Sequence, residues 1–185
     1  TDKSEYLTAL HNHTLPVLLN TEKVEKGDCF FIPAGTVHAI CKGCYIAEIQ
    51  QTSDITYRIY DYDRRDKNGN PRELHTELAT DVINFCEQKQ HNIHYHQHEN
   101  HTEELVSCNY FTTNYLKFDK EVEKDYIELD SFVIYMCLEG NFTLVYDVDK
   151  TVKVTKGETI LVPAILKNLF LIPETEAEIL EIYIR

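Results

Sequence analysis

The chain has 185 residues and a mass of 21.6 kDa, a length that fits one domain or two small ones. Hydrophobic residues make up 43% and charged residues 26% of the sequence, which excludes a wholly disordered chain. The formal net charge of −13 argues against nucleic acid as a partner, because a phosphate backbone repels such a chain. The longest apolar run, 132–138, is far shorter than the ~20 residues that cross a bilayer, so no membrane partner is expected.

The first third of the chain is expected to form a helix followed by short strands. Within residues 3–13, apolar side chains from Tyr6 to Leu10 are spaced as on one face of a helix. From Asp28 onward, short segments rich in Phe, Ile, Val and Tyr alternate with turn residues. This pattern predicts strands at 28–33, 37–41, 44–50 and 55–62.

A turn, a second helix and a polar stretch are expected next. Lys67-Asn68-Gly69-Asn70 is a typical turn sequence. The apolar spacing between Leu74 and Phe85 is that of one helix face, which predicts a helix over about 75–86. Residues 87–103 are polar, show no regular apolar pattern and are interpreted as a linker.

Five histidines lie in this polar stretch, and they allow two interpretations. His94, His96 and His98 would share one face of a strand, whereas positions 91, 94, 98 and 101 would share one face of a helix. Either arrangement would resemble a metal-binding tract. The tract His91–His101 lacks the apolar residues that would fix either form, which favours a solvated linker that binds metal only adventitiously.

The second half of the chain is expected to be an antiparallel β domain. Many short apolar segments follow one another with brief turns between them, which is typical of a sandwich or barrel. The predicted strands are 104–118, 126–138, 140–147, 151–155, 158–162, 166–172 and 177–184.

An internal repeat indicates two related domains. Lys26-Gly27-Asp28-Cys29-Phe30-Phe31-Ile32-Pro33-Ala34 is similar to Lys156-Gly157-Glu158-Thr159-Ile160-Leu161-Val162-Pro163-Ala164, which lies 130 residues later. About fifty residues of predicted strand precede the second copy, but only a helix precedes the first. We therefore expect half of a β domain at 1–88, a His-rich linker at 89–103 and a complete β domain at 104–185.

One motif in the first copy carries chemistry. Gly27-x5-Pro33-x-Gly35-x2-His38 matches the second half of the cupin motif, in which glycines permit sharp turns and proline ends a strand. His38 would then begin the return strand, where a neutral imidazole is a good ligand for Zn²⁺. The alternative is a histidine with a purely structural role. In the second copy the equivalent of His38 is Asn168, so we expect that barrel to bind no metal.

The sequence beyond His38 resembles a more specific family. The segments that carry the resemblance are Ile32-Pro33-Ala34-Gly35-Thr36-Val37-His38-Ala39, then Ala47-Glu48-Ile49-Gln50-Gln51-Thr52-Ser53-Asp54-Ile55-Thr56-Tyr57-Arg58-Ile59-Tyr60-Asp61-Tyr62-Asp63-Arg64, and Pro71-Arg72-Glu73-Leu74-His75. They are similar to the short bacterial form of type I mannose-6-phosphate isomerase, in its C-terminal portion. The resemblance implies a mainly β fold with cupin barrels (double-stranded β-helix, or jelly roll), one partial and one complete, and a few helices.

The resemblance also implies an activity and a site. The family interconverts mannose 6-phosphate and fructose 6-phosphate, and it holds one zinc ion through Gln, His, Glu and a last His. His38 matches that last metal ligand, Arg58 the catalytic arginine, and Glu48 the acidic residue that lines the sugar-phosphate pocket. The family's other three ligands would lie before residue 1, so a complementing N-terminal chain or self-association is expected.

Other interpretations stay open at this point. Without the resemblance, Arg58 would be interpreted as a surface residue paired with Asp61 or Asp63. The whole chain could also be a catalytically inactive sugar-binding or regulatory cupin, or a β module without a ligand. Six scattered cysteines, including Cys41 and Cys44 on an expected turn, are interpreted as unpaired thiols of a cytoplasmic protein.

Overall fold

A computed structural model describes residues 1–53, 55–86 and 91–185 of the chain. The chain divides into two units, Thr1–Asn92 and Ile93–Arg185. The boundary between them lies inside the stretch 89–103 that the sequence analysis assigns to a linker. Among the described residues, no helix is long and apolar enough to span a membrane.

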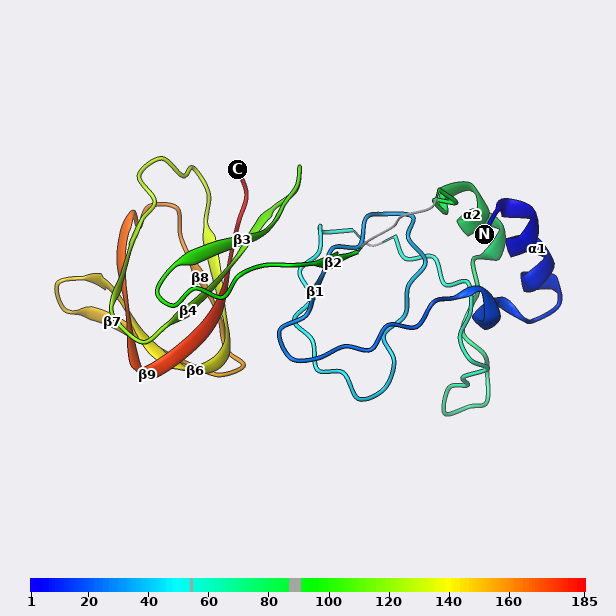
Figure 1. Ribbon diagram of the computed structural model, residues 1–185, viewed down its shortest axis with the longest axis horizontal. Helices are drawn as coiled ribbons and strands as arrows, with labels where there is room; N and C mark the ends of the chain where they lie inside the picture. The colour runs from blue at the N-terminus through cyan, green and yellow to red at the C-terminus, as the bar shows by residue number, and fades with distance from the viewer. Residues whose placement is uncertain (54, 87–90) are drawn as a thin grey trace. The chain divides into compact units, whose positions relative to one another are not determined.

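The second unit is built from antiparallel strands that form one continuous sheet (Figure 1). The order of its main strands is β3-β4-β9-β6-β7, while β5 pairs with β9 and β8 pairs with β6. Their bounds are β3 Thr102–Ser107, β4 Thr112–Phe118, β5 Val122–Asp125, β6 Val133–Asp147, β7 Lys150–Thr155, β8 Thr159–Val162 and β9 Asn168–Tyr183.

The two long strands, β6 and β9, each contribute to both layers of this unit. The first part of β6 pairs with β8 and with the end of β9, whereas its second part pairs with β7 and with the beginning of β9. Opposite ends of β9 also pair with β4 and β5. This arrangement is the cupin jelly roll that the sequence predicts.

Several predicted strand boundaries in this unit are wrong. The predicted strand 104–118 is divided into β3 and β4, and β5 lies where no strand was predicted. The predicted breaks near Glu139 and between 172 and 177 do not occur, because β6 and β9 continue through both positions. The pairing of β6 with β9 instead shifts register at two bulges on either side of Gly140. The predicted strand 126–138 also begins too early, since Tyr126 opens a turn in which its carbonyl accepts a hydrogen bond from Leu129.

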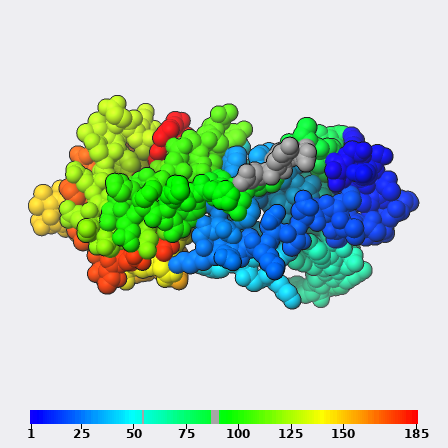
Figure 2. Space-filling view, in the orientation of Figure 1, coloured from blue at the N-terminus to red at the C-terminus, as the bar shows by residue number. Residues whose placement is uncertain are grey.

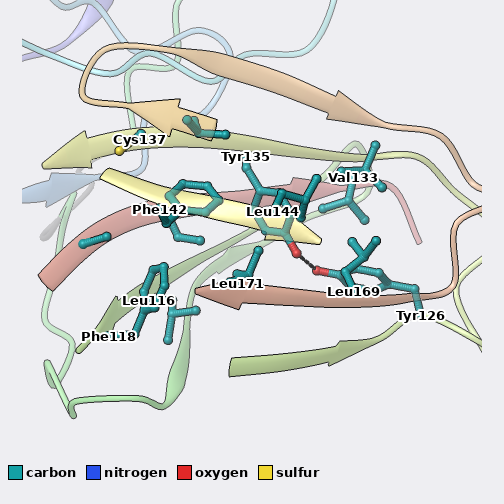
Figure 3. Packing of buried hydrophobic residues seen from close by; sticks show 14 residues of the cluster. Leu116, Phe118, Tyr126, Val133, Tyr135, Cys137, Phe142, Leu144, Leu169 and Leu171 are labelled. Carbon is teal, nitrogen blue, oxygen red and sulfur yellow. Dashed lines mark hydrogen bonds between the residues drawn. The ribbon is translucent and has the colours of Figure 1, made fainter. Parts of the chain in front are cut away.

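The core of the second unit lies between its two layers (Figure 3). Alternate residues of the strands point inward, as the period of a β-strand requires. Phe118 and Phe142 meet edge to face with ring centroids 5.8 Å apart, and both side chains are fully buried. The largest of the other fully buried side chains are Tyr135, Leu116, Leu169, Leu171 and Ile179.

A buried polar cluster interrupts this apolar core. The Glu181 carboxylate, which is 2% exposed, lies 3.0 Å from Lys124 Nζ and accepts a hydrogen bond of 2.8 Å from Asn114 Nδ2. The Tyr126 hydroxyl donates to the same carboxylate and is hydrogen-bonded to the hydroxyl of Tyr135, as Figure 3 shows for the two tyrosines. Burial raises the pKa of both tyrosines, so their hydroxyls keep their protons.

The first unit begins with two short helical segments. Helix α1 (Lys3–His11) starts at a capping box, in which the Asp2 carboxylate accepts from the Glu5 N–H and the Glu5 carboxylate accepts from the Asp2 N–H. The turn expected around Pro16 is a 3₁₀ helix, η1 (Leu15–Leu18). Tyr6 of α1 is buried and meets Phe85 with ring centroids 5.7 Å apart.

The second helix is shorter than the sequence predicts. Helix α2 spans Thr76–Val82, whereas the apolar spacing predicts a helix to about residue 86. The helix ends because the Asn84 N–H donates a hydrogen bond of 2.9 Å to the carbonyl of Gly35 instead of to a carbonyl in the preceding turn of α2. Gly35 has a φ of +84°, and a side chain there would meet the carbonyl of Val82 at 2.6 Å.

Most strands predicted for the first unit do not form in the described residues. Only β1 (Cys29–Phe30) appears, paired with β2 (Asn92–Ile93), and the predicted segments 37–41, 44–50 and 55–62 have no strand pairing. Their chain, blue to cyan, is visible at the surface in Figure 2. A strand needs a neighbouring strand for its hydrogen bonds, and the apolar pattern of a segment does not supply one.

The two copies of the repeat have the same local structure. Gly27 and Gly157 both have positive φ, at +96° and +86°. In both copies the acidic side chain after this glycine accepts a hydrogen bond of 2.8 Å from a backbone N–H three residues before it. Each copy also closes a turn on its proline, at Pro33 and Pro163. The sequence repeat is therefore a structural repeat as well, although its surroundings differ.

Candidate active site

Arg58 lies in a segment without strand pairing, but both its N–H and its carbonyl are hydrogen-bonded. Its N–H donates to His75 Nδ1 at 3.1 Å, and its carbonyl accepts from the His75 N–H at 2.7 Å. The guanidinium group donates through Nη1 to the carbonyl of Glu73 at 3.2 Å. Arg58 is half-buried, so part of its guanidinium group remains available to a ligand.

Residues 58–75 form an irregular hairpin-like loop that places Arg58 at its base. Contacts across the loop join Arg58 to His75, Asp61 to Arg72, Arg65 to Pro71 and Asp66 to Asn70. The predicted turn 67–70 is confirmed at its tip, where Gly69 has a φ of +83°. The loop thus brings residues from two segments of the resemblance to the same place.

One ion pair in this loop answers a question that the sequence leaves open. The Asp61 carboxylate is buried and accepts two hydrogen bonds from the Arg72 guanidinium group. The bond donated by Nε is 2.7 Å long, and Nη2 donates the other. These hydrogen bonds lower the pKa of Asp61, although burial alone would raise it. The nearby positive charge of Arg58 lowers it further. Asp61 therefore pairs with Arg72, and the alternative in which it pairs with Arg58 is wrong.

His38 has the local geometry of a metal ligand. It lies beyond the turn at Gly35 and is exposed. Its Nδ1 lies 2.9 Å from the carbonyl of Thr36, which can only accept a hydrogen bond, so Nε2 is the ring nitrogen that this contact leaves available to a metal ion. Such a bond to a backbone carbonyl fixes the ring orientation of metal-bound histidines. His38 thus fits a role as one ligand of a metal ion.

The structure does not bring the predicted site residues into direct contact. Glu48 is exposed on the extended segment 44–50, and among the described residues no hydrogen bond or ion pair joins any two of His38, Glu48 and Arg58. In the described part of the chain, no three His, Cys, Asp or Glu side chains gather as a metal site would require. The roles of the three residues remain predictions.

The described part of the histidine-rich tract makes several hydrogen bonds. His91 Nδ1 lies 3.2 Å from the carbonyl of Phe31, next to the pairing of β1 with β2. His98 Nδ1 lies 2.6 Å from the Glu103 carboxylate. Asn100 is hydrogen-bonded to the backbone of Lys117 in β4. Residues 87–90 of the predicted linker lie outside the described residues.

The sequence analysis missed His75 as a residue that holds Arg58. His75 was part of the segment that carries the family resemblance, but its spacing of 17 residues from Arg58 gave no sign of a contact. The expected turn at Cys41 and Cys44 is present, and both thiols are exposed and free.

The chain is similar to curated proteins over most of its length. No model of a known protein family matches the sequence. The chain is 35% identical, over 88% of its length, to a putative mannose-6-phosphate isomerase of Bacillus subtilis, YvyI, and to the mannose-6-phosphate isomerase ManA of the same organism. It covers 51% of each relative, so it spans about half the length of the curated relatives it matches.

A solved structure agrees with these relatives. The crystal structure of the mannose 6-phosphate isomerase from Bacillus subtilis matches 99% of this chain with a TM-score of 0.87 and 32% sequence identity. This chain covers 57% of that structure. The match includes both units, the loop that holds Arg58 and the jelly roll. The chain is therefore a homologue of these mannose-6-phosphate isomerases over about half of their length, and it has a cupin fold.

Proposed function

We propose that this chain forms part of an enzyme that interconverts mannose 6-phosphate and fructose 6-phosphate. The observation that carries the proposal is the match of 99% of the chain to the Bacillus subtilis isomerase, with a TM-score of 0.87. Two curated relatives named as isomerases support it at 35% identity. The alternative of an inactive sugar-binding or regulatory cupin gains no support from these relatives.

Arg58 is the residue that we assign to catalysis. The reaction moves a proton between neighbouring carbon atoms of the sugar through an enediolate, whose oxygen becomes negatively charged. A guanidinium group that is already in place stabilises that charge without reorganising during the reaction. The hydrogen bonds of Arg58 to His75 and Glu73 support this assignment, because they fix its backbone and the direction of its side chain.

Glu48 and His38 complete the proposed roles of this chain. Glu48 is exposed and binds sugar hydroxyls or helps to transfer the proton, both of which a carboxylate can do. His38 would hold a zinc ion through Nε2, and a bound zinc ion supplies positive charge that polarises the sugar carbonyl. Zinc normally takes at least three protein ligands, and the residues that the structure describes gather no such group, so the proposal includes further ligands from a complementing segment.

The proposed enzyme acts in the cytoplasm. All six cysteines are free, as expected for a reducing compartment.

A chimera tests the function directly. In it, this chain replaces the matched part of the Bacillus subtilis isomerase, and zinc content and initial rate are measured together. The chimera should bind one zinc ion and isomerise mannose 6-phosphate, whereas the 185-residue chain alone should do neither. A chimera that binds zinc and folds but does not turn over the sugar phosphate would contradict the proposal.

Two variants of the chimera separate the roles of the residues. His38→Ala should lose zinc and activity together. Arg58→Ala should keep zinc but lose rate by roughly 10²–10³-fold, the loss that follows removal of one preorganised donor to an oxyanion. An Arg58→Ala chimera with a normal rate would remove Arg58 from the mechanism.

A further inference from the structure

The backbone of Arg58 depends on a single side chain for its position. Its segment forms no strand among the described residues, so its N–H has no partner in a neighbouring strand. The partner of that N–H is instead the His75 ring, at 3.1 Å from Nδ1. The side chain of His75 therefore replaces a sheet hydrogen bond at the residue that carries the proposed catalytic charge.

His75 is in turn fixed from its other side. Its carbonyl accepts a hydrogen bond of 2.9 Å from the Ala79 N–H in the first turn of α2. Its backbone N–H donates 2.7 Å to the Arg58 carbonyl, and its ring lies 6.0 Å from the ring of Tyr57. His75 precedes α2, but its side chain makes no capping bond to the helix. Replacing the ring should therefore leave the helix start intact.

We propose that His75 is the positioning residue for Arg58, and that its Nδ1 sets the orientation from which the guanidinium group reaches the sugar phosphate. The inference rests on the proposed function of Arg58. Because Nδ1 accepts the Arg58 N–H, the ring is neutral and carries its proton on Nε2. His75 acts through Arg58 and does not itself touch the substrate.

The expected effect follows from geometry. Without the ring, the Arg58 N–H loses its partner and the peptide before Arg58 gains rotational freedom. A displacement of about 1 Å at a reacting group costs roughly 10²-fold in rate. Such a change affects the transition state more than the bound sugar, so kcat falls while KM changes little.

Three variants at one position test the inference in the zinc-loaded chimera. In His75→Asn the amide oxygen replaces Nδ1, whereas in His75→Gln the polar group lies further out, near the place of Nε2. We expect His75→Ala and His75→Gln to lower kcat by roughly 10–100-fold with KM and zinc content unchanged. His75→Asn should stay within about threefold of the parent, because it restores the acceptor. Equal rates for the Ala and Asn variants would overturn the inference.

A second measurement needs no catalysis. In the 185-residue chain, hydrogen exchange of the Arg58 amide should become faster in His75→Ala and recover in His75→Asn, while exchange in the β6–β9 ladder stays unchanged. Unchanged exchange at Arg58 would overturn the inference. If Arg58→Ala itself has a normal rate, the proposed function of Arg58 fails; if Arg58→Ala is impaired and His75→Ala is not, only the positioning role fails.

Discussion

Two lysines of the second unit pair with carboxylates at nearly the same distance but in different surroundings. Lys124 Nζ lies 3.0 Å from Glu181, and the two side chains are 9% and 3% exposed. Lys150 Nζ lies 2.9 Å from Asp147, and those side chains are 62% and 52% exposed. Water can solvate the partner of Lys150 when the lysine is removed, but it cannot reach the partner of Lys124.

Removing these two lysines should therefore have unequal effects on stability. Lys124→Ala leaves the Glu181 charge buried and should lower the free energy of unfolding by about 3–5 kcal/mol. Lys150→Ala should leave it unchanged within error, because exposed pairs contribute little. Urea unfolding of both variants measures the difference, and similar midpoints would contradict the importance of burial.

The pairing of Asp61 with Arg72 predicts a pH effect in the first unit. Because the pKa of Asp61 is lowered in the folded chain, its contribution is present above the ordinary pKa of an aspartate and is lost as the pH falls through the folded value. In Arg72→Gln this pKa should rise, since the hydrogen bonds from Arg72 are its main cause. A pH titration of the Asp61 carboxyl by NMR measures the shift. Arg65→Gln is the control, and an equal rise there would contradict the assignment.

At the scale of single elements, β6 can pass from one layer to the other because of Gly140. Gly140 has a φ of +71°, and a side chain at this position would meet the carbonyl of Glu176 at 2.0 Å. Gly157 has a φ of +86°, but a Cβ at that position would meet no atom of the described residues within 4 Å. The two glycines share a backbone conformation and differ in the space around them.

Alanine at these glycines should separate backbone strain from crowding. Gly157→Ala should cost about 1–2 kcal/mol, the usual cost of a left-handed conformation for an L-residue. Gly140→Ala should cost a further 1–3 kcal/mol or so, because β9 must move away from the new methyl group. Thermal or urea unfolding measures the free energy of unfolding that each variant loses. Equal losses in the two variants would contradict a separate cost of crowding at Gly140.

The elements also show what the sequence could predict and what it could not. Apolar alternation located most strands of the second unit, because each of those strands finds a pairing partner in the same sheet. The same alternation failed at 37–62, since pairing partners do not follow from the pattern of one segment. The motif around Pro33 predicted the turn that precedes His38, and this turn is present, while the role of His38 stays a prediction. The bond from Arg58 to His75 could not be predicted, because a side chain there takes the place of a strand.

At the scale of the whole molecule, the first unit exposes apolar side chains on its extended segments. Tyr45 is 93% exposed and Ile55 is 68% exposed, and neither lies in a strand of the described residues. Extended segments without strand partners recruit other strands, and apolar exposure adds to this tendency. We therefore predict that the 185-residue chain self-associates unless a complementing segment is present.

Sedimentation velocity over a range of concentrations measures this association. The Tyr45→Ser, Ile55→Ser double variant should shift the distribution toward the monomer. Val148→Ser, at a position 91% exposed in the second unit, should not change it. A chain that remains monomeric at high concentration would contradict the prediction, as would an equal response to the Val148 control.

The sharing of β6 and β9 between both layers has a consequence for how the second unit opens. Neither layer can lose its hydrogen bonds while the other keeps them, since the same two strands run through each. Partial opening is therefore confined to the strands that have a single pairing partner, β3, β5, β7 and β8. The inner ladder should exchange its amide protons only through complete unfolding, so the barrel behaves as a single cooperative unit and not as two sheets that separate.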